Sequence, residues 1–187
     1  MGFNIGVSSE QIPDDFDCHV FIGRAFYNFV NDGEQYGDES ILIKAGQYYG
    51  LDLTPLLKLV YTWDEVSEEY IKENIQSVDF LLNLILAFRD KVQNDNSVCD
   101  KIKYVWYGQS INLSQAEIDK LITEMGEEMA RPFLDTIELQ KKEIDENPNP
   151  WKWYFEQQQI IEDLSNLIKS IQCYKEKGAT EIYLTAG

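Results

Sequence analysis

Histidine and arginine are scarce in this chain: one histidine and three arginines occur among its 187 residues. A single histidine, His19, excludes the paired Glu-x-x-His motifs of a di-iron bundle and the two-histidine motif of a zinc protease. Cys18 precedes His19 directly, and neighbours in a helix point in different directions, so the two do not predict a nucleophile and its base. The sequence also lacks glycine-rich phosphate loops and a Gly-x-Ser-x-Gly elbow. It therefore predicts no catalytic, cofactor-binding or metal-binding residue.

Cysteine is nearly as rare. Cys18, Cys99 and Cys173 are 81 and 74 residues apart, which fits neither a zinc knuckle nor a close redox pair. An odd number of widely spaced cysteines favours buried, reduced thiols. The first residues lack the charged start and apolar run of a signal peptide, and the longest apolar stretch, 78–88, is too short to span a bilayer. We therefore expect a cytoplasmic protein without a membrane partner.

Positive charge is the third deficit. Sixteen lysines and arginines stand against 33 acids, giving a formal net charge of −17 and an isoelectric point near 4.3. Nucleic-acid binding needs a basic face, so nucleic acid is not predicted as a partner. Hydrophobic residues make up 44% of the chain, enough for an ordered core. The acidic surplus is uneven, because residues 1–100 contain eighteen acids and six bases.

Helical periodicity dominates what is present. From Ile71, apolar residues recur at intervals of three and four, which predicts a helix over 67–93. Its other faces are apolar as well, so this helix is expected at the centre of a bundle. The same reasoning predicts a long helix over 151–177 and shorter helices over 15–31, 39–49 and 54–61.

A capping-box pattern marks the start of another helix. Ser114 and Glu117 have the spacing at which each side chain bonds the other's backbone N–H. Pro132 should bend or divide this helix, because it lacks a backbone donor and crowds the preceding turn. The predicted inner stripe consists of Ile118, Leu121, Ile122, Met125, Met129, Phe133 and Ile137.

Three segments have the composition of strands. Residues 2–8 and 180–185 are short, contain β-branched residues and lie at the two ends of the chain. Residues 101–107 begin with polar–apolar alternation, although 97–107 could instead form one more helix. The sequence predicts a mainly α (α+β) fold, a single domain over 1–187. It is expected to be a helical bundle around a central apolar helix, with a small sheet from the chain termini and possibly 101–107.

Parts of the sequence resemble a bacterial family, the YfbM-like proteins. The similar stretches are Gly-Phe-Asn-Ile-Gly-Val-Ser-Ser at the start, Ile-Asn-Leu-Ser-Gln-Ala-Glu-Ile-Asp-Lys-Leu over 111–121, and a closing helix followed by Lys177-Gly178 and Glu-Ile-Tyr-Leu. The resemblance covers about a third of the chain, and 10–95 does not follow the family pattern. It implies an α+β architecture and no particular function.

Acidic residues in two stretches, the first over 32–39 and the second over 64–73, form a candidate interaction patch. Part of the second stretch has another explanation, because acids near the start of a helix complement its dipole. If the acids form a docking surface, the two stretches should lie together and steer a basic partner. The alternative is a solubilising role. The candidate residues are Asp64, Glu65, Glu68, Glu69, Glu73, Asp32, Glu34, Asp38 and Glu39.

Tryptophans beside turns are candidate contact residues. Trp151 and Trp153 are two positions apart and cannot both face the core of one helix, and Trp106 stands shortly before Gly108. An exposed tryptophan is typical of interfaces. The alternative is that these rings cover the ends of the bundle.

Polar residues interrupt the predicted central helix. Asp79 and Asn83 are four apart and share a face, while Arg89 lies on the main apolar stripe. We hypothesise that all three are paired polar groups in or beside the core, since an unpaired charge there would be costly. Alternatively, Asp79 and Asn83 mark a narrow strip that faces solvent.

Two functional classes fit these observations. The first, which we favour, is a non-enzymatic acidic binding module that neutralises a basic protein in the manner of an immunity protein or antitoxin. The second is a magnesium-dependent hydrolase of small phosphorylated molecules, with carboxylates on facing helices as ligands. Acids at helical spacing are common on any solvated face, so the second class rests on little. Its ligands would come from Glu65, Glu68, Glu69 and Glu73, or from Glu117, Glu124, Glu127 and Glu128.

Overall fold

The fold is known from a computed structural model that describes residues 4–12, 18–62, 66–102, 113–146 and 149–187. It divides into two compact units. Unit 1 comprises Met1–Ile102 together with Trp151–Gly187, and unit 2 comprises Lys103–Pro150. The sequence predicts one domain over 1–187. That the two units fold together as this domain stays a prediction.

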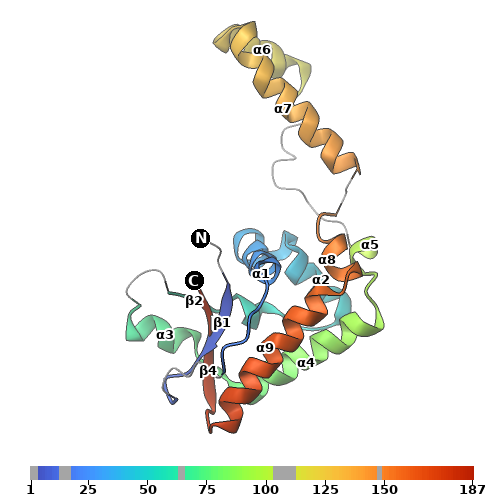
Figure 1. The fold of residues 1–187 in the computed structure, drawn as a ribbon. Helices are drawn as coiled ribbons and strands as arrows, with labels where there is room; N and C mark the ends of the chain where they lie inside the picture. Colours follow the sequence, from blue (N-terminus) through green and yellow to red (C-terminus); the bar gives the residue numbers. More distant parts are fainter. Residues whose placement is uncertain (1–3, 13–17, 63–65, 103–112, 147–148) are drawn as a thin grey trace. The chain divides into compact units, whose positions relative to one another are not determined.

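Unit 1 combines a small sheet with helices (Figure 1). The sheet has the order β1-β4-β2, and β3 also pairs with β4. β1 and β3 run antiparallel to β4, and β2 runs parallel to it. The strands are β1 (Ile5–Ser8), β2 (Leu59–Tyr61), β3 (Gln76–Ser77) and β4 (Glu181–Ala186). The helices are α1 (Arg24–Tyr36), α2 (Ile41–Tyr49), α3 (Glu68–Asn74), α4 (Val78–Asn94), α5 (Val98–Lys101), α8 (Lys152–Glu156) and α9 (Gln159–Glu176), with the 3₁₀ turns η2 (Gly37–Glu39) and η3 (Thr54–Leu57).

The two ends of the chain meet in this sheet, as the sequence predicts. Ile5 pairs with Ala186 and Val7 with Leu184. These four side chains are buried, while their strand neighbours are partly exposed. Alternating burial fixes the register, because a slip of one residue would turn the apolar side chains to solvent. The mainly α fold with a small sheet from both termini is confirmed.

Helices α4 and α9 pack against each other and form the core of unit 1 (Figure 1). α4 buries six apolar side chains, and α9 buries five together with Tyr174 and two polar residues. Phe29 of α1 adds an aromatic cluster with Phe88, Tyr154 and Phe155. The buried residues of α4 are Val78, Leu81, Leu82, Ile85, Phe88 and Val92.

The predicted helix over 67–93 is wrong as one element. It is interrupted between α3 and α4, where Gln76 and Ser77 pair with β4. Ser77 then caps α4 by accepting the N–H of Phe80, and the Gln76 side chain donates to the carbonyl of Pro55. Strand pairing and a new cap thus replace the helical bonds that periodicity alone would continue.

Other predicted boundaries also change. The helix predicted over 151–177 is divided by Gln158, whose φ of 60° lies in the left-handed region. The helix predicted over 54–61 is a 3₁₀ turn followed by β2, and α1 begins at Arg24 rather than near 15. Of the segment 97–107, the described part begins as α5 and the remainder lies outside the described residues.

Unit 2 contains a helical hairpin, α6 (Gln115–Met125) and α7 (Glu127–Glu146). The predicted capping box is confirmed: Ser114 accepts the N–H of Glu117, whose carboxylate accepts the N–H of Ser114. The division falls at Gly126, with φ of 80°, and not at Pro132. Pro132 lies inside α7, which continues past it.

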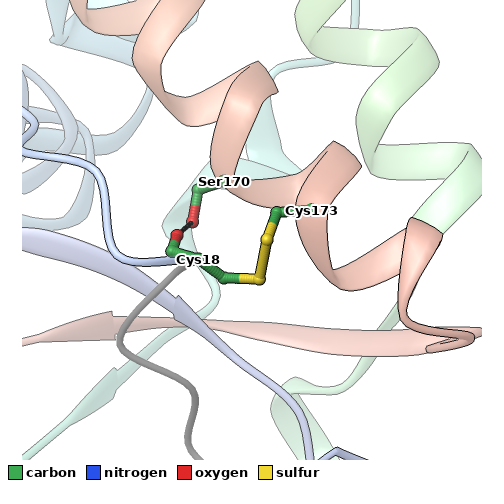
Figure 2. The surroundings of a disulfide bond; sticks show 3 residues. All are labelled: Cys18, Ser170 and Cys173. Atoms are coloured by element: carbon green, nitrogen blue, oxygen red, sulfur yellow. Dashed lines mark hydrogen bonds between the residues drawn. A yellow bond between two sulfur atoms is a disulfide. The ribbon is translucent and has the colours of Figure 1, made fainter.

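A disulfide joins Cys18 to Cys173, across 155 residues of sequence. Figure 2 shows the bond between the segment before α1 and α9, where Ser170 Oγ donates to the carbonyl oxygen of Cys18 at 2.7 Å. The prediction of three reduced thiols is therefore wrong for this pair, whereas the buried Cys99 is not part of a disulfide. Spacing along the chain could not reveal the pair, because it depends on a tertiary contact between the segment before α1 and helix α9.

Truncation of the α4 core tests the packing directly. We expect Leu82→Ala to lower the free energy of unfolding by about 2–5 kcal/mol, because it removes a buried side chain and leaves a cavity. Asn83→Ala is the matched control, since the adjacent Asn83 is exposed, and it should change stability by less than about 0.5 kcal/mol. Urea unfolding measures both, and equal losses would contradict the packing.

Reduction of the disulfide should destabilise unit 1. A crosslink that closes a loop this long removes much conformational entropy from the unfolded chain, so we expect the oxidised protein to be more stable by about 3–5 kcal/mol. Urea unfolding with and without a phosphine reductant measures the difference. Equal stability of the two forms, with both thiols verified as free after reduction, would contradict the pairing.

Candidate interaction surface

The acidic residues predicted from the second stretch lie partly on α3. Glu68, Glu69 and Glu73 are all exposed, and α3 buries none of its side chains. Lys72 forms an exposed ion pair with Glu68 at 3.6 Å, which contributes little to stability. The other two predicted residues, Asp64 and Glu65, lie outside the described residues.

Asp32 of the first acidic stretch is not at the surface, where the candidate patch requires it. The Asp32 carboxylate is buried and accepts the backbone N–H of Ile41 at 3.0 Å, at the start of α2. This carboxylate therefore supports a helix start rather than a docking surface. Asp38 is exposed in η2, and the side chains of Glu34 and Glu39 are outside the described residues.

The candidate tryptophans separate into different environments. Trp151 is half-buried, with its ring 5.6 Å from that of Phe29, and so packs against the aromatic cluster of unit 1. Trp153 is 45% exposed and contacts Tyr154 edge-on. Trp106 lies outside the described residues.

The three polar residues of α4 are not buried partners. Asp79 and Asn83 are exposed, so the solvent-facing strip describes them, and Asp79 forms an ion pair with Lys175 of α9 at 2.7 Å. Arg89 is half-buried, and its guanidinium lies 3.3 Å from the carboxylate of its neighbour Asp90. Burial in the core is therefore wrong for Asp79 and Asn83, although Asp79 is paired with Lys175 at the surface.

Exposed apolar side chains concentrate on the hairpin of unit 2. Met129 is 68% exposed and Phe133, one turn later on the same face of α7, is 50% exposed. Met125 is exposed at the end of α6. Together with Leu139, these are four of the eight large exposed apolar residues in the described part of the chain. We refer to Met125, Met129 and Phe133 as the hairpin face.

The pattern of burial within the hairpin explains why this face is exposed. Ala130 and Ile137 are buried in unit 2, and α6 contacts α7. These positions use the inner side of α7, so Met129 and Phe133 fall beside the α6–α7 contact. The predicted inner stripe is correct for Ile137 and wrong for the exposed Met125, Met129 and Phe133. Its remaining residues, Ile118, Leu121 and Ile122, are half-buried.

The segment that carries the hairpin face is rich in negative charge. Residues 114–138 contain seven acids and two bases, and all seven carboxylates are exposed. Beside them, a cavity of about 430 Å³ is lined by Glu127, Glu128, Arg131, Pro132 and Asp135. Arg131 already has an acidic neighbour, since its guanidinium lies 3.7 Å from Glu127. An apolar surface with an acidic rim is typical of a protein-binding site.

Two aspartates of unit 1, the buried Asp163 and the half-buried Asp95, accept hydrogen bonds from neighbouring residues. Asp163 of α9 is 1% exposed and accepts the N–H of Gly23 at 2.7 Å and the Tyr154 hydroxyl at 2.8 Å. It thereby caps α1, whose own N-cap residue is a glycine. Burial raises the pKa of the Asp163 carboxyl, although both hydrogen bonds oppose that rise. Hydrogen bonds from Ser97 and Tyr48 lower the pKa of Asp95 to about 2.

The described residues contain neither a metal-binding cluster nor a membrane-spanning helix. There, no group of three or more His, Cys, Asp or Glu side chains is placed to hold a metal ion. Among the described helices, none has the length and apolar character that crossing a membrane requires. Comparison with protein-family models, curated proteins and solved structures finds no match. The resemblance to the YfbM-like proteins therefore stays a prediction.

The Asp163 cap gives a prediction about pH. Asp163→Ala should cost about 2–4 kcal/mol, because it removes the acceptor of the buried Tyr154 hydroxyl and of the half-buried Gly23 N–H. Asp163→Asn retains an acceptor for Gly23 and should cost less. The folded pKa of Asp163 lies above its ordinary value of 3.8. At a pH between these two values, the Asp163 carboxyl is therefore protonated in the folded state and ionised in the unfolded state.

The stability advantage of wild type over Asp163→Asn should therefore be largest below about pH 4 and fall as pH rises through the folded pKa. Urea unfolding between pH 3 and pH 7 measures it. An advantage that instead grows with pH would contradict the raised pKa.

Proposed function

We propose that this protein is a non-enzymatic binding module for a basic protein partner, and that the hairpin face is its docking surface. The observation that carries the proposal is the coincidence of Met125, Met129 and Phe133, all exposed, with an excess of five acids over bases in residues 114–138. Neither feature alone is informative, since single exposed apolar residues and acidic helices are both common.

In the proposed binding, the acidic side chains and the apolar side chains act at different steps. Exposed carboxylates attract a cationic partner over a distance of about 8 Å at physiological salt, which raises the association rate. Methionine and phenylalanine then provide apolar contact, and methionine adapts to partner surfaces of varied shape. The partner that suits both is an amphipathic basic segment, with lysine or arginine beside leucine-like side chains.

Neutralisation of a basic partner, as by an immunity protein or antitoxin, is the biological role that we propose for this binding. Support comes from the acidic chain, with 33 acids against 16 bases, and from a single histidine. Nucleic acid is not proposed as a partner, for the same electrostatic reason. A magnesium-dependent hydrolase would need converging carboxylates, and no described group of three favours it.

A pair of designed peptides tests the proposal. The probe is a 14-residue amphipathic helix of leucine and lysine, and the control peptide replaces every lysine with glutamate. We expect the lysine peptide to bind, with an association rate that falls as salt rises. Glu124→Gln/Glu127→Gln/Glu128→Gln should slow association by about tenfold at low salt, and Met129→Ala/Phe133→Ala should speed dissociation. Stopped-flow fluorescence measures both rates.

The α3 acids provide the matched control variant. Glu68→Gln/Glu69→Gln/Glu73→Gln removes the same number of exposed carboxylates from another helix, so it should change the association rate by less than about twofold. Equal effects of the two triple variants would show that net charge, and not the hairpin face, attracts the peptide. Equal binding of the lysine and glutamate peptides would refute the proposal.

A further inference from the structure

Strand β1 has an open edge. In the described part of the sheet it pairs with β4 on one side only. Asn4 and Gly187 exchange two backbone hydrogen bonds, which places Gly6 and Ser8 in the hydrogen-bonded positions of this antiparallel ladder. The backbone groups of Ile5 and Val7 therefore point away from β4. Within the described residues, no backbone hydrogen bond from outside the sheet reaches them.

A cavity of about 310 Å³ lies beside this edge. Four consecutive residues of the β1 end, Asn4–Val7, line one part of it, and the segment 19–22 lines another. We call this cavity the β1 slot. The chain before α1 runs beside β1 in Figure 1, yet none of the described hydrogen bonds joins the backbone of 19–22 to that of β1. The described backbones of the two segments are therefore not paired with each other, although both line the slot.

The lining of the slot restricts what can bind there. Its described lining includes no lysine, arginine, aspartate or glutamate side chain, and His19 is the one histidine among these residues. A phosphate or a metal cation therefore meets no cluster of charged side chains there. Its polar groups include the hydroxyls of Thr62 and Thr185, and Phe21, 73% exposed, is also part of the lining. An uncharged ligand with both apolar and hydrogen-bonding groups suits this surface.

We infer that the β1 slot binds an extended, uncharged stretch of a partner polypeptide as an added strand. The N–H and C=O groups of Ile5 and Val7 repeat at two-residue spacing, which is the pattern that a neighbouring strand satisfies. One wall is held in place independently, because the disulfide and the Ser170 hydrogen bond fix Cys18 just before the segment 19–22. This site is separate from the hairpin face, and it requires no positive charge on the peptide.

Amide hydrogen exchange of the full chain, followed by NMR in its disulfide-bonded form, tests the inference. The probe is the peptide acetyl-Val-Thr-Val-Thr-Val-amide. In the free protein, the amides of Ile5 and Val7 should exchange faster than those of Gly6 and Ser8, which bond to β4. Saturating peptide should slow exchange at Ile5 and Val7 by about tenfold or more, and leave Gly6 and Ser8 unchanged.

Two controls keep the outcome specific. A peptide with N-methyl groups on alternate residues loses its donors along one edge and should give no protection. Val20→Trp should fill the slot and abolish protection, whereas Phe80→Trp, at an exposed α4 position outside the slot, should not. Slow exchange at Ile5 and Val7 before peptide is added would overturn the inference. Equal protection of the wild-type protein by the N-methylated peptide would also overturn it. The same holds if the unmodified peptide gives no protection.

Discussion

The antiparallel pairing of β1 with β4 is the constraint on which unit 1 depends. It joins residues 5–8 to residues 183–186, so nearly the whole chain lies inside the loop that it closes. The entropic cost of such closure grows only with the logarithm of loop length, and the buried Ile5, Val7, Leu184 and Ala186 offset it. The disulfide from Cys18 to Cys173 crosslinks the same two regions.

This closure separates two roles along the chain. Residues 1–102 and 151–187 build the sheet and the α4–α9 core, while the intervening residues 103–150 contain the hairpin of unit 2. A short two-helix unit has too little interior to bury every apolar residue, and it buries Ala130 and Ile137 while Met129 and Phe133 stay exposed. In the proposed function, the residues that this small unit leaves exposed are those that contact a partner.

Local signals in the sequence predicted the elements well and their environments less well. The capping box at Ser114 and the terminal strands are confirmed, because each depends on neighbouring residues or simple alternation. The break at Gln76–Ser77 was missed because its cause is β4, about a hundred residues away. The disulfide and the buried role of Asp32 also depend on tertiary contacts. The exposed hairpin face was missed because periodicity identifies an apolar stripe, but not whether another element covers it; the isolated Gly126 was the available signal for a break.

Oxidation of methionine by dilute peroxide tests the central claim that the hairpin face is open in the free protein. Mass spectrometry of the intact, disulfide-bonded chain can follow Met125 and Met129 separately. We expect Met129, the more exposed of the two, to be oxidised at nearly the rate of a short unstructured peptide, and the bound leucine–lysine peptide to protect both residues. Slow oxidation of Met129 in the free protein, or oxidation unchanged by the bound peptide, would contradict it.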